Sequence, residues 1–304
     1  MTFLAAVIQD SPILFDLHST IEKVDKITKK ASEKGASLIV FPEAFISAYP
    51  KGLDFGAKVG SRTQKGREEF LQYYNSSLDF NSKEYFKLLN IAKKNKTFLV
   101  IGVIEKTSGT LFCTVLHISN KGELMCKHRK VMPTAAERLV WGFGDGSTLQ
   151  TAKTSLGVLG SVICWENYMP MMRMAMYNQG IQLYCTPTAD DRDTWQSTVK
   201  HIALEGRCFV FSSCQYVTIN DYPSNFKVSK TTKDDVVMKG GSCIVSPLGN
   251  VIASAGNKKS SIIYADINLD EIIKGKYDFD VVGHYSRPDI FELKVNKKSK
   301  KPVI

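Results

Sequence analysis

This chain of 304 residues lacks several features that mark other classes of protein. No apolar run approaches the roughly 18 residues that a membrane-spanning helix needs. The first apolar run, residues 3–8, has no basic leader and is cut short by Gln9 and Asp10, so it predicts a strand rather than a signal peptide. We therefore expect no membrane association.

Paired cysteines are also missing. The seven cysteines are an odd number, and no two of them form a Cys-x-x-Cys motif. Several fall inside predicted strands, where reduced thiols are commonly buried. This usage argues against a disulfide framework and a structural zinc site, and it favours a cytoplasmic protein. We assign no metal and no cofactor to the chain.

A nucleic-acid-binding pattern is absent as well, although the formal net charge is +10. Lys and Arg residues are spread along the chain, and the only dense cluster lies at residues 294–301. No basic motif interleaved with aromatic residues occurs. A solvated, flexible end explains the cluster, so we expect no nucleic-acid partner, while an anionic partner such as a neighbouring subunit stays open.

What the chain contains is an alternation of helices and strands, with 43% hydrophobic residues that can bury a large core. Apolar residues at helical spacing run from Leu17 to Ala31, before Gly35, and a second such face surrounds Leu88. Helix followed by strands occurs twice, which fits one α/β domain with two helix-covered sheets. We expect strands at 3–8, 38–41, 97–104, 110–118, 123–126, 149–152, 157–163 and 181–185, and second-sheet strands at 209–216, 242–246, 251–255 and 261–266.

Three stretches interrupt this alternation. Residues 51–78 are rich in glycine and charge, and they predict a loop with a helical piece that can cover a pocket. Residues 216–239 are polar and predict a long surface excursion. Beyond residue 273 the chain becomes irregular and basic, which predicts an extension from the domain.

The best candidate for a nucleophile is Cys164. An apolar run ends abruptly at Cys164-Trp165-Glu166-Asn167, and Pro170 and a Met-rich amphipathic segment follow. This order predicts a strand, a sharp turn and a helix, the geometry that presents a nucleophile at a strand tip. A helix N-terminus there would favour the thiolate. The alternative is a structural cysteine, because most buried cysteines are merely small apolar residues.

Glu43 is the candidate base. The apolar run that ends at Phe41 is stopped by Pro42, so Glu43 should emerge at the end of a strand. Its neighbours are apolar, and desolvation raises the pKa of a carboxyl toward the range of a useful general base. An exposed surface glutamate is the alternative.

Lys130 follows the predicted hairpin of residues 110–126, beside His128 and Arg129. A loop at this strand end can converge with Glu43 and Cys164, where an ammonium would stabilise negative charge on a reacting adduct. Glu137 is the natural partner to orient Lys130 and keep it protonated. A solvated basic loop and a surface ion pair are the alternatives for these two residues.

Two further groups invite a functional interpretation, but each has a simpler explanation. Asp190 and Asp191 resemble a metal site, yet they precede a predicted helix, where acidic residues complement the helix dipole. His201 is another conceivable base, but a papain-like Cys-His pair would need an Asn partner and a local signature that are absent. We expect a buried structural histidine.

Several ordered motifs resemble those of the nitrilases, the nitrile-hydrolysing branch of a carbon–nitrogen hydrolase superfamily. The residues Cys164-Trp165-Glu166-Asn167 match the nitrilase signature. The segments Phe41-Pro42-Glu43-Ala44-Phe45 and Lys127-His128-Arg129-Lys130 match the contexts of the other two catalytic groups, in the family's order. The match continues through residues 133–138, 142–147, 184–190 and 201–206.

The resemblance implies a four-layer α-β-β-α sandwich over residues 1–275, with a C-terminal extension at 276–304 that contacts another subunit. It implies a catalytic triad of Glu43, Lys130 and Cys164, and it favours a catalytic role for Glu137. Nitrilases typically form dimers that build spirals, so we expect a homo-oligomer. For the substrate pocket, the resemblance suggests Tyr49, Trp141, Trp165 and Pro187.

The predicted reaction is hydrolysis of an organic nitrile to a carboxylic acid and ammonia through a covalent adduct of Cys164. The aromatic pocket residues favour an apolar substituent, without choosing between aromatic and aliphatic nitriles. A nitrile or cyanide hydratase, or an amidase, could use the same triad. A non-catalytic, filament-forming protein on the same fold is an alternative of another class.

Overall fold

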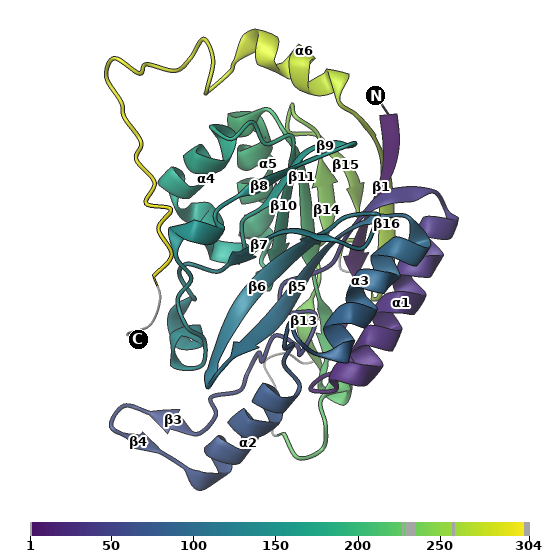
Figure 1. Ribbon diagram of the computed structural model, residues 1–304, viewed down its shortest axis with the longest axis vertical. Coiled ribbons are helices and arrows are strands. Elements are labelled where there is room, and N and C mark those ends of the chain that lie inside the picture. Colours follow the sequence, from purple (N-terminus) through teal and green to yellow (C-terminus); the bar gives the residue numbers. More distant parts are fainter. Residues whose placement is uncertain (1, 227, 229–234, 257–258, 301–304) are drawn as a thin grey trace.

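The computed structural model describes residues 2–226, 228, 235–256 and 259–300 (Figure 1). One sheet contains β1 (Thr2–Gln9), β2 (Ala36–Val40), β5 (Phe98–Thr107), β6 (Thr110–Ile118), β7 (Leu124–Arg129) and β16 (Ser261–Asn268), in the order β16-β1-β2-β5-β6-β7. The other contains β8 (Thr151–Thr154), β9 (Gly157–Ser161), β10 (Leu183–Thr188), β11 (Phe209–Cys214), β14 (Cys243–Val245) and β15 (Val251–Ser254), in the order β15-β14-β11-β10-β9-β8. The two sheets pack against each other.

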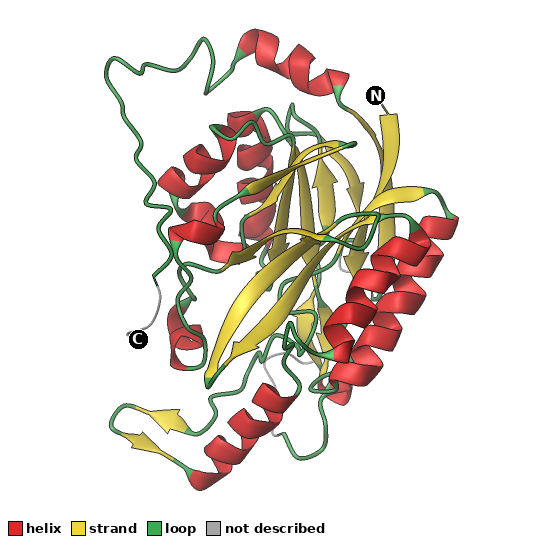
Figure 2. Cartoon of the chain, in the orientation of Figure 1, coloured by secondary structure: helices red, strands yellow, loops and turns green. Residues whose placement is uncertain are grey.

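Helices cover the outer face of each sheet, which gives four layers in the order α, β, β, α (Figure 2). The first sheet carries α1 (Leu17–Glu33) and α3 (Lys83–Asn95), and the second carries α4 (Pro170–Tyr177) and α5 (Asp193–Gly206). This arrangement confirms the predicted four-layer sandwich.

The apolar pattern of the sequence explains the layers. Asp16 caps α1 by accepting a hydrogen bond from the Ser19 backbone N–H, and the helix buries Ile21, Val24 and Ala31 against the first sheet. Between the sheets, buried residues of both meet in one cluster, among them Val7, Val40, Val100, Leu159, Leu183 and Phe211. Strands with apolar residues on both faces are therefore covered on both sides.

The strand of residues 261–268 lies in the first sheet, so its predicted place in the second sheet was wrong. β16 pairs with β1 antiparallel along its whole length, from Thr2 opposite Asn268 to Gln9 opposite Ser261. Most of β1 is buried, and an unpaired edge there would leave buried backbone groups without partners. A partner from the far end of the chain satisfies them.

The segment after β11 differs from the predicted surface excursion. β12 (Tyr216–Thr218) pairs with β13 (Val236–Lys239), and Val217, Tyr222 and Phe226 are buried in the cluster between the sheets. These three apolar residues, which are spread through a largely polar segment, thus hold the described part of that segment against the core. Residues 227 and 229–234 of this prediction lie outside the described residues.

Residues 51–78 form the predicted loop with a helical piece. The short hairpin of β3 (Ala57–Lys58) and β4 (Ser61–Arg62) leads into α2 (Gln64–Asn75), and both extend from the lower end of the sandwich in Figure 1. The 3-10 helices are η1 (Ala135–Leu139), η2 (Gly146–Thr148), η3 (Cys164–Tyr168) and η4 (Ile219–Asp221).

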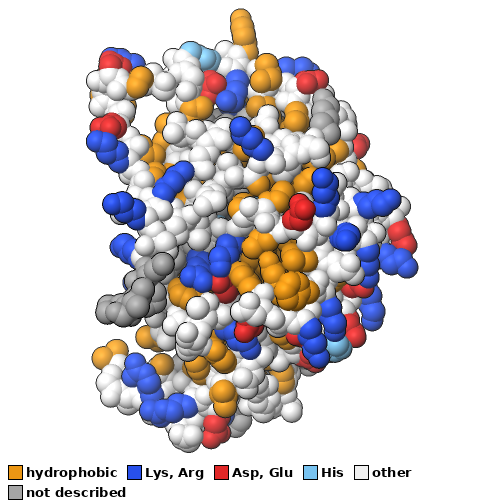
Figure 3. Space-filling model, in the orientation of Figure 1, with side chains coloured by type: hydrophobic (Ala, Val, Ile, Leu, Met, Phe, Trp, Pro, Cys, Tyr) orange, Lys and Arg blue, Asp and Glu red, His pale blue; other side chains and the backbone are white. Residues whose placement is uncertain are grey.

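Between α6 (Asp270–Asp278) and residue 300 the chain runs without helix or strand along the outside of α4 (Figure 1). The division into a domain of residues 1–275 and an extension stays a prediction, and α6 runs across its boundary. Lys and Arg side chains are spread over the face shown in Figure 3. None of the helices within the described ranges combines the length and apolar character that crossing a bilayer requires.

Candidate active site

The Glu43 side chain is held by a strained loop after β2. Ala44, Ser47 and Ala48 have φ angles of 49°, 88° and 80°, a left-handed region that disfavours residues with a Cβ. Ser47 Oγ donates to Ser76 O at 2.6 Å, and Gln215 Nε2 donates to Glu43 O at 2.7 Å. Such strain persists where the surrounding structure holds it, and it is concentrated at functional sites.

A glycine in β5 makes room for this loop. The Gly102 N–H donates to Pro42 O at 3.1 Å, and Gly102 O accepts from the Ile46 N–H at 3.1 Å. A Cβ at Gly102 would lie 2.3 Å from Pro42 O and 2.7 Å from Glu43 Cα. The backbone that carries Glu43 therefore approaches β5 more closely than any other residue type would permit.

Lys130 lies directly after β7, between two carboxylates. Its ammonium Nζ donates to Glu43 Oε1 at 2.7 Å and to Glu137 Oε2 at 2.8 Å, and the lysine side chain is fully buried. Burial alone would lower the pKa of Lys130, but the Glu43 and Glu137 carboxylates raise it well above its usual value. The lysine is thus held as an ammonium.

Glu43 experiences the opposite balance. Burial raises the pKa of its carboxyl, the Lys130 ammonium lowers it, and the Glu137 carboxylate raises it again, with a net increase. One ammonium cannot fully neutralise two carboxylates. Glu43 therefore has the increased proton affinity that a general base requires, as its apolar sequence context predicts.

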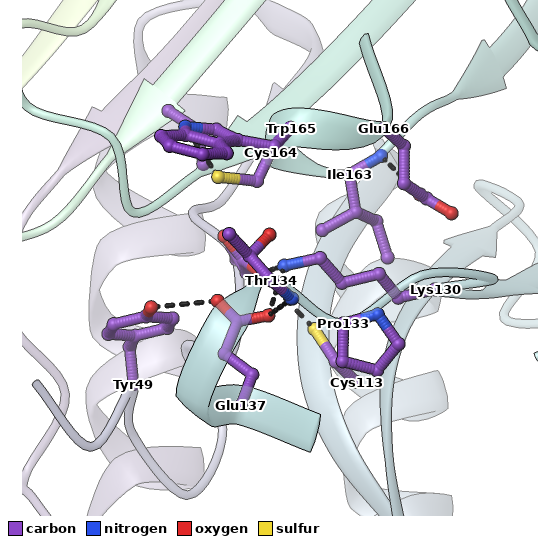
Figure 4. Close-up of polar contacts among 12 residues, drawn as sticks. Tyr49, Cys113, Lys130, Pro133, Thr134, Glu137, Ile163, Cys164, Trp165 and Glu166 are labelled. Carbon is purple, nitrogen blue, oxygen red and sulfur yellow. Dashed lines mark hydrogen bonds and ion pairs between the residues drawn. The ribbon is translucent and has the colours of Figure 1, made fainter. Parts of the chain in front are cut away.

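Glu137 is fixed by three donors. It accepts from Lys130 Nζ, from the Thr134 N–H at 2.6 Å and from Tyr49 Oη at 2.7 Å (Figure 4). Thr134 is the residue before the first turn of η1, and its N–H donates to the Glu137 side chain. Glu137, a catalytic candidate, therefore also caps the helix in which it lies. The predicted pairing of Glu137 with Lys130 is present in the structure.

Cys164 occupies the predicted sharp turn. β9 ends at Ser161, and Cys164 begins η3 with a φ of 49°, in the left-handed region. Figure 4 shows its thiol, the Lys130 ammonium and the Glu137 carboxylate directed into the same space. A nucleophile on a strained turn after a strand is the elbow geometry that the sequence predicts.

The predicted effect of a helix dipole on Cys164 does not dominate. The long helix α4 begins at Pro170, and Cys164 lies in a single 3-10 turn before it. Burial and the Glu43 carboxylate raise the pKa of the thiol to about 12, and the Lys130 ammonium and Thr188 hydroxyl offset this only in part. Cys164 is therefore a thiol at neutral pH, and a role as nucleophile would need a base to remove its proton.

Glu166 joins the two halves of the site. Its carboxylate accepts from the Ile163 N–H at 3.0 Å, from the Val131 N–H at 2.6 Å and lies 3.0 Å from His128 Nε2. Ile163 precedes the nucleophile, and Val131 follows the lysine. One buried carboxylate thus fixes the Cys164 turn to the Lys130 segment.

Asn167 holds the elbow from within. Its Nδ2 lies 2.9 Å from Val162 O, 2.8 Å from Cys164 O and 2.9 Å from Thr186 Oγ1. Its Oδ1 accepts from Tyr184 Oη at 2.9 Å. The last residue of the Cys-Trp-Glu-Asn motif therefore satisfies the carbonyl groups that the sharp turn leaves exposed.

A cavity of about 190 Å³ opens beside Cys164, and two of the four predicted pocket residues line it. Trp165 donates from Nε1 to Asp190 Oδ2 at 2.8 Å, and the Arg192 guanidinium lies over its ring, 4.7 Å from the centroid. The lining residues are Tyr49, Thr134, Glu137, Cys164, Trp165, Ala189, Asp190, Asp191 and Arg192.

Trp141 and Pro187 do not line that cavity. The Trp141 ring packs edge-on against Tyr49, and its centroid lies 5.6 Å from Lys130 Nζ. Pro187 lies within β10, where it pairs with Ser213 of β11. Their role in substrate binding stays a prediction.

Two expectations about residues near the site were wrong. His201 is not buried, since its side chain is 62% exposed and lies on the outer face of α5, 3.5 Å from Glu205. Asp190 and Asp191 precede α5 and do not stand in its first turn, which holds Asp193. They instead bind Trp165, Arg192, Lys51 and the Lys239 N–H.

Sequence reasoning missed two side chains that touch the candidate catalytic groups. Thr188 Oγ1 lies 3.2 Å from Cys164 Sγ, and Cys113 Sγ lies 3.5 Å from Glu43 Oε1. Thr188 lies three residues beyond the predicted strand of residues 181–185, and in the structure it ends β10, which pairs with β9, the strand before the Cys164 turn. This position could have revealed it. Cys113 is in the middle of a strand, where nothing in the sequence distinguishes it from a core residue.

Comparison with known proteins places the chain in a family. A family model described as carbon-nitrogen hydrolase matches residues 4–277. The chain is 51% identical, over 99% of its length, to an aliphatic nitrilase of Sinorhizobium fredii, of which it covers 98%. It is 48% identical, again over 99% of its length, to a bifunctional nitrilase/nitrile hydratase of Nicotiana tabacum, of which it covers 88%.

Solved structures with low sequence identity share the fold. A carbon–nitrogen hydrolase from Helicobacter pylori has a TM-score of 0.75 at 20% identity, covering 95% of this chain and 97% of that one. A Saccharomyces cerevisiae member of the nitrilase superfamily has a TM-score of 0.71 at 22% identity, covering 93% and 96%. The chain therefore belongs to the carbon–nitrogen hydrolase family and, within it, to the nitrilases.

Proposed function

We propose that this protein hydrolyses organic nitriles to the carboxylic acid and ammonia, with Glu43, Lys130, Glu137 and Cys164 as its catalytic groups. The observation that carries the proposal is the buried Lys130 ammonium between two carboxylates, facing the Cys164 elbow. The base, the cation and the nucleophile thus surround one small space, as covalent catalysis requires.

In the first half of the reaction, Glu43 takes the proton from the Cys164 thiol. The sulfur adds to the nitrile carbon, and the proton passes to the nitrile nitrogen, which gives a thioimidate. Glu43 then activates a water molecule that adds to the same carbon and gives a tetrahedral adduct. The raised pKa of Glu43 suits both proton transfers.

In the second half, the tetrahedral adduct expels ammonia and leaves a thioester of Cys164. A second water molecule, again activated by Glu43, releases the carboxylic acid and restores the thiol. Lys130 and the Trp165 backbone N–H stabilise the negative charge that develops, and one such donor contributes on the order of 10²-fold to 10³-fold in kcat. Glu137 keeps Lys130 oriented.

The product depends on which bond of the tetrahedral adduct breaks. If the carbon–sulfur bond breaks first, the product is an amide, and the protein acts as a nitrile hydratase. This second activity is proposed because a relative at 48% identity is named as a bifunctional nitrilase/nitrile hydratase. The cavity of about 190 Å³ and the aliphatic nitrilase among the relatives favour a short aliphatic substituent.

The test measures ammonia and amide release across aromatic, arylacetic, cinnamic and aliphatic nitriles, with amides as controls. Wild-type protein should release ammonia from nitriles, fastest from short aliphatic ones. Cys164→Ala should release none, while Cys208→Ala, which truncates another buried cysteine, should remain active. Unchanged ammonia release from Cys164→Ala would refute the mechanism.

The proposal extends to the state of the protein in the cell. We propose a cytoplasmic homo-oligomer that can extend into a filament. All seven cysteines are free and buried, which suits a reducing compartment. Met171 on α4 is exposed beside Ile290 and Phe291 of the extension, an apolar surface of the kind that subunits cover. Light scattering at several concentrations tests the assembly.

A further inference from the structure

Thr188 ends β10 with its hydroxyl against the nucleophile. The residue is fully buried, and its Oγ1 lies 3.2 Å from Cys164 Sγ. The same oxygen accepts a hydrogen bond from the Asp190 N–H at 2.9 Å. Thr188 is therefore held between a backbone donor and a sulfur atom.

This arrangement indicates which group donates the hydrogen bond between Thr188 and the sulfur of Cys164. A hydroxyl carries one hydrogen, and its oxygen already accepts from the Asp190 N–H. A thiolate can only accept. Once Cys164 loses its proton, the Thr188 hydroxyl donates to the sulfur, and a charge-assisted hydrogen bond of this kind is stronger than a neutral one.

The turn that carries Thr188 is itself fixed. The carboxylate of Asp190 accepts from Trp165 Nε1 at 2.8 Å and from Arg192 Nη2 at 2.6 Å. Trp165 is the neighbour of the nucleophile in sequence, so the Thr188 turn and the Cys164 turn are tied together. The hydroxyl does not need to reorganise as charge develops on sulfur.

The thiolate needs such a donor because its surroundings are unfavourable. Burial and the Glu43 carboxylate both oppose ionisation of Cys164, and the Lys130 ammonium is shared between two carboxylates. The titratable and charged groups that interact with the sulfur are Glu43, Lys130, Glu137, Tyr49, Arg192 and Cys214.

We propose that Thr188 is a fifth catalytic residue, whose hydroxyl stabilises the Cys164 thiolate when it attacks and again when it leaves the thioester. The proposal rests on Cys164 being the nucleophile of the proposed function. It deepens that function by assigning a neutral donor to the sulfur, distinct from the cation that serves the substrate nitrogen and oxygen.

The test compares Thr188→Val, which keeps the shape of the side chain, with Thr188→Ser, which keeps the hydroxyl. Alkylation of Cys164 by iodoacetamide, located by peptide mass, reports the fraction of thiolate at each pH. Thr188→Val should react about tenfold more slowly below the pKa of the thiol. Its kcat should fall on the order of a hundredfold with KM nearly unchanged, and Thr188→Ser should restore both.

Thr28→Val is the matched control, because Thr28 is buried on α1 with a hydroxyl that has no partner among the described residues. If Thr188→Val alkylates along the wild-type pH profile and keeps its kcat, the proposal is wrong. If it does not fold, Thr188→Ala against Thr188→Ser gives the same comparison. Alkylated wild-type protein that still releases ammonia would instead overturn the role of Cys164.

A separate observation concerns the two oxygens of Glu43. Oε1 accepts from Lys130 Nζ and from the Cys113 thiol, at 2.7 Å and 3.5 Å, whereas Oε2 is buried without a partner among the described residues. Burial keeps the pKa of the Cys113 thiol well above its usual value, so it remains a donor. The Cys113 carbonyl also accepts the Lys130 N–H at 2.8 Å.

We infer that Cys113 is a positioning residue that saturates Oε1 and leaves Oε2 to take the proton of Cys164. Cys113→Ala removes a donor to the ionised carboxylate, so the acidic limb of the kcat/KM profile should move to higher pH. Cys113→Ser should keep it near the wild-type position. The titratable and charged groups that interact with Glu43 are Lys130, Glu137, Cys113, Cys164, Tyr49, Tyr73 and Cys214.

Cys208→Ala is the control, since Cys208 is fully buried in the cluster beneath α4 and α5. An acidic limb that stays in place in folded Cys113→Ala would overturn the inference. A loss of ammonia release in Cys208→Ala as well would show a packing effect and also overturn it.

Discussion

The two sheets hold the proposed catalytic groups in different ways. The first sheet contributes Glu43 and Lys130, charged side chains that fix each other through an ion pair and that need Glu137 as a third member. The second sheet contributes Cys164 and Thr188, which are neutral in the resting state and are placed by a strained turn. Charged groups can be held by their mutual attraction, whereas a nucleophile without charge has to be placed by the backbone.

This difference predicts where a substitution affects stability as well as activity. Removing the Lys130 ammonium, which pairs with both carboxylates of the buried cluster, leaves those two charges unpaired in a medium of low polarity. Removing the sulfur of Cys164 leaves no unpaired charge. The predictions below test this contrast, in order of the expected change in the free energy of unfolding.

Lys130→Met should have the largest effect. Two buried carboxylates would then face each other without a cation, which costs about 3–5 kcal/mol, and ammonia release should fall by at least about 10³-fold. Urea denaturation and an ammonia assay measure both. Lys127→Met is the matched control, because Lys127 is partly exposed and its partner Glu105 keeps Arg129. Equal losses of stability in the two variants would contradict the contrast.

Gly102→Ala should come next, since the new Cβ would collide with the backbone that carries Glu43. Overpacking of this kind costs about 1–3 kcal/mol. Displacement of the base by a fraction of an ångström to 1 Å should lower kcat on the order of 10²-fold. Gly109→Ala is the control on the same hairpin, where a Cβ meets nothing within 4 Å. Wild-type kcat in Gly102→Ala would show that the close approach has no catalytic purpose.

Asn167→Ala should weaken the second sheet's part of the site. It leaves buried acceptors at Val162, Cys164 and Thr186 without their donor, which costs about 1–3 kcal/mol. The relaxed elbow should reduce the rate of Cys164 alkylation. Asn225→Ala removes an exposed contact with Gln72 and should change neither quantity. An unchanged alkylation rate in Asn167→Ala would show that the hydrogen bonds of Asn167 do not set the geometry of the Cys164 turn.

Glu43→Gln should abolish activity without loss of stability. Burial raises the pKa of Glu43, so the ionised form is disfavoured in the folded state relative to the unfolded chain. The wild-type protein therefore loses stability as pH rises from the usual carboxyl pKa through the raised one. Gln avoids this loss, so the variant should be more stable than the wild type at neutral pH, and the difference should shrink toward pH 4.5. A lower unfolding midpoint at neutral pH would contradict it.

His201→Gln should have the smallest effect. The side chain is exposed and contacts Glu205 at 3.5 Å, and such pairs contribute less than about 1 kcal/mol. Melting temperature and ammonia release should both match the wild type. A loss of activity would require a role for His201 that its position on α5 does not suggest.

The sequence predicted those parts of the site that depend on strand ends. Glu43 after Pro42, Lys130 after a hairpin and Cys164 after an apolar run each follow from local patterns, and the structure brings the three together. Gly102 was not identified, because a close approach of two backbones depends on a segment about 60 residues away in the chain. Cys113 and Thr188 could be identified only from the structure, because their roles depend on contacts with Glu43 and Cys164, which are distant in the sequence.

The fold was predictable to the same degree. Helices and most strands follow from apolar periodicity, as α1 shows, and their order indicates two covered sheets. The assignment of β16 to the second sheet was wrong because apolar periodicity predicts that a segment is a strand but not which strand it pairs with. His201 was misjudged for a similar reason: the face of α5 that packs on the second sheet is set by Trp195, Val199 and Ile202, and His201 lies outside it.

The pairing of β1 with β16 has a consequence for synthesis of the protein. β1 is translated well before its partner β16, so the nascent chain carries β1 with one open edge until residues 261–268 emerge. A translation product that stops before residue 261 would keep that edge permanently, and exposed apolar edges recruit other strands. Such truncated products should aggregate, and chaperones that shield strand edges should associate with the growing chain until β16 emerges.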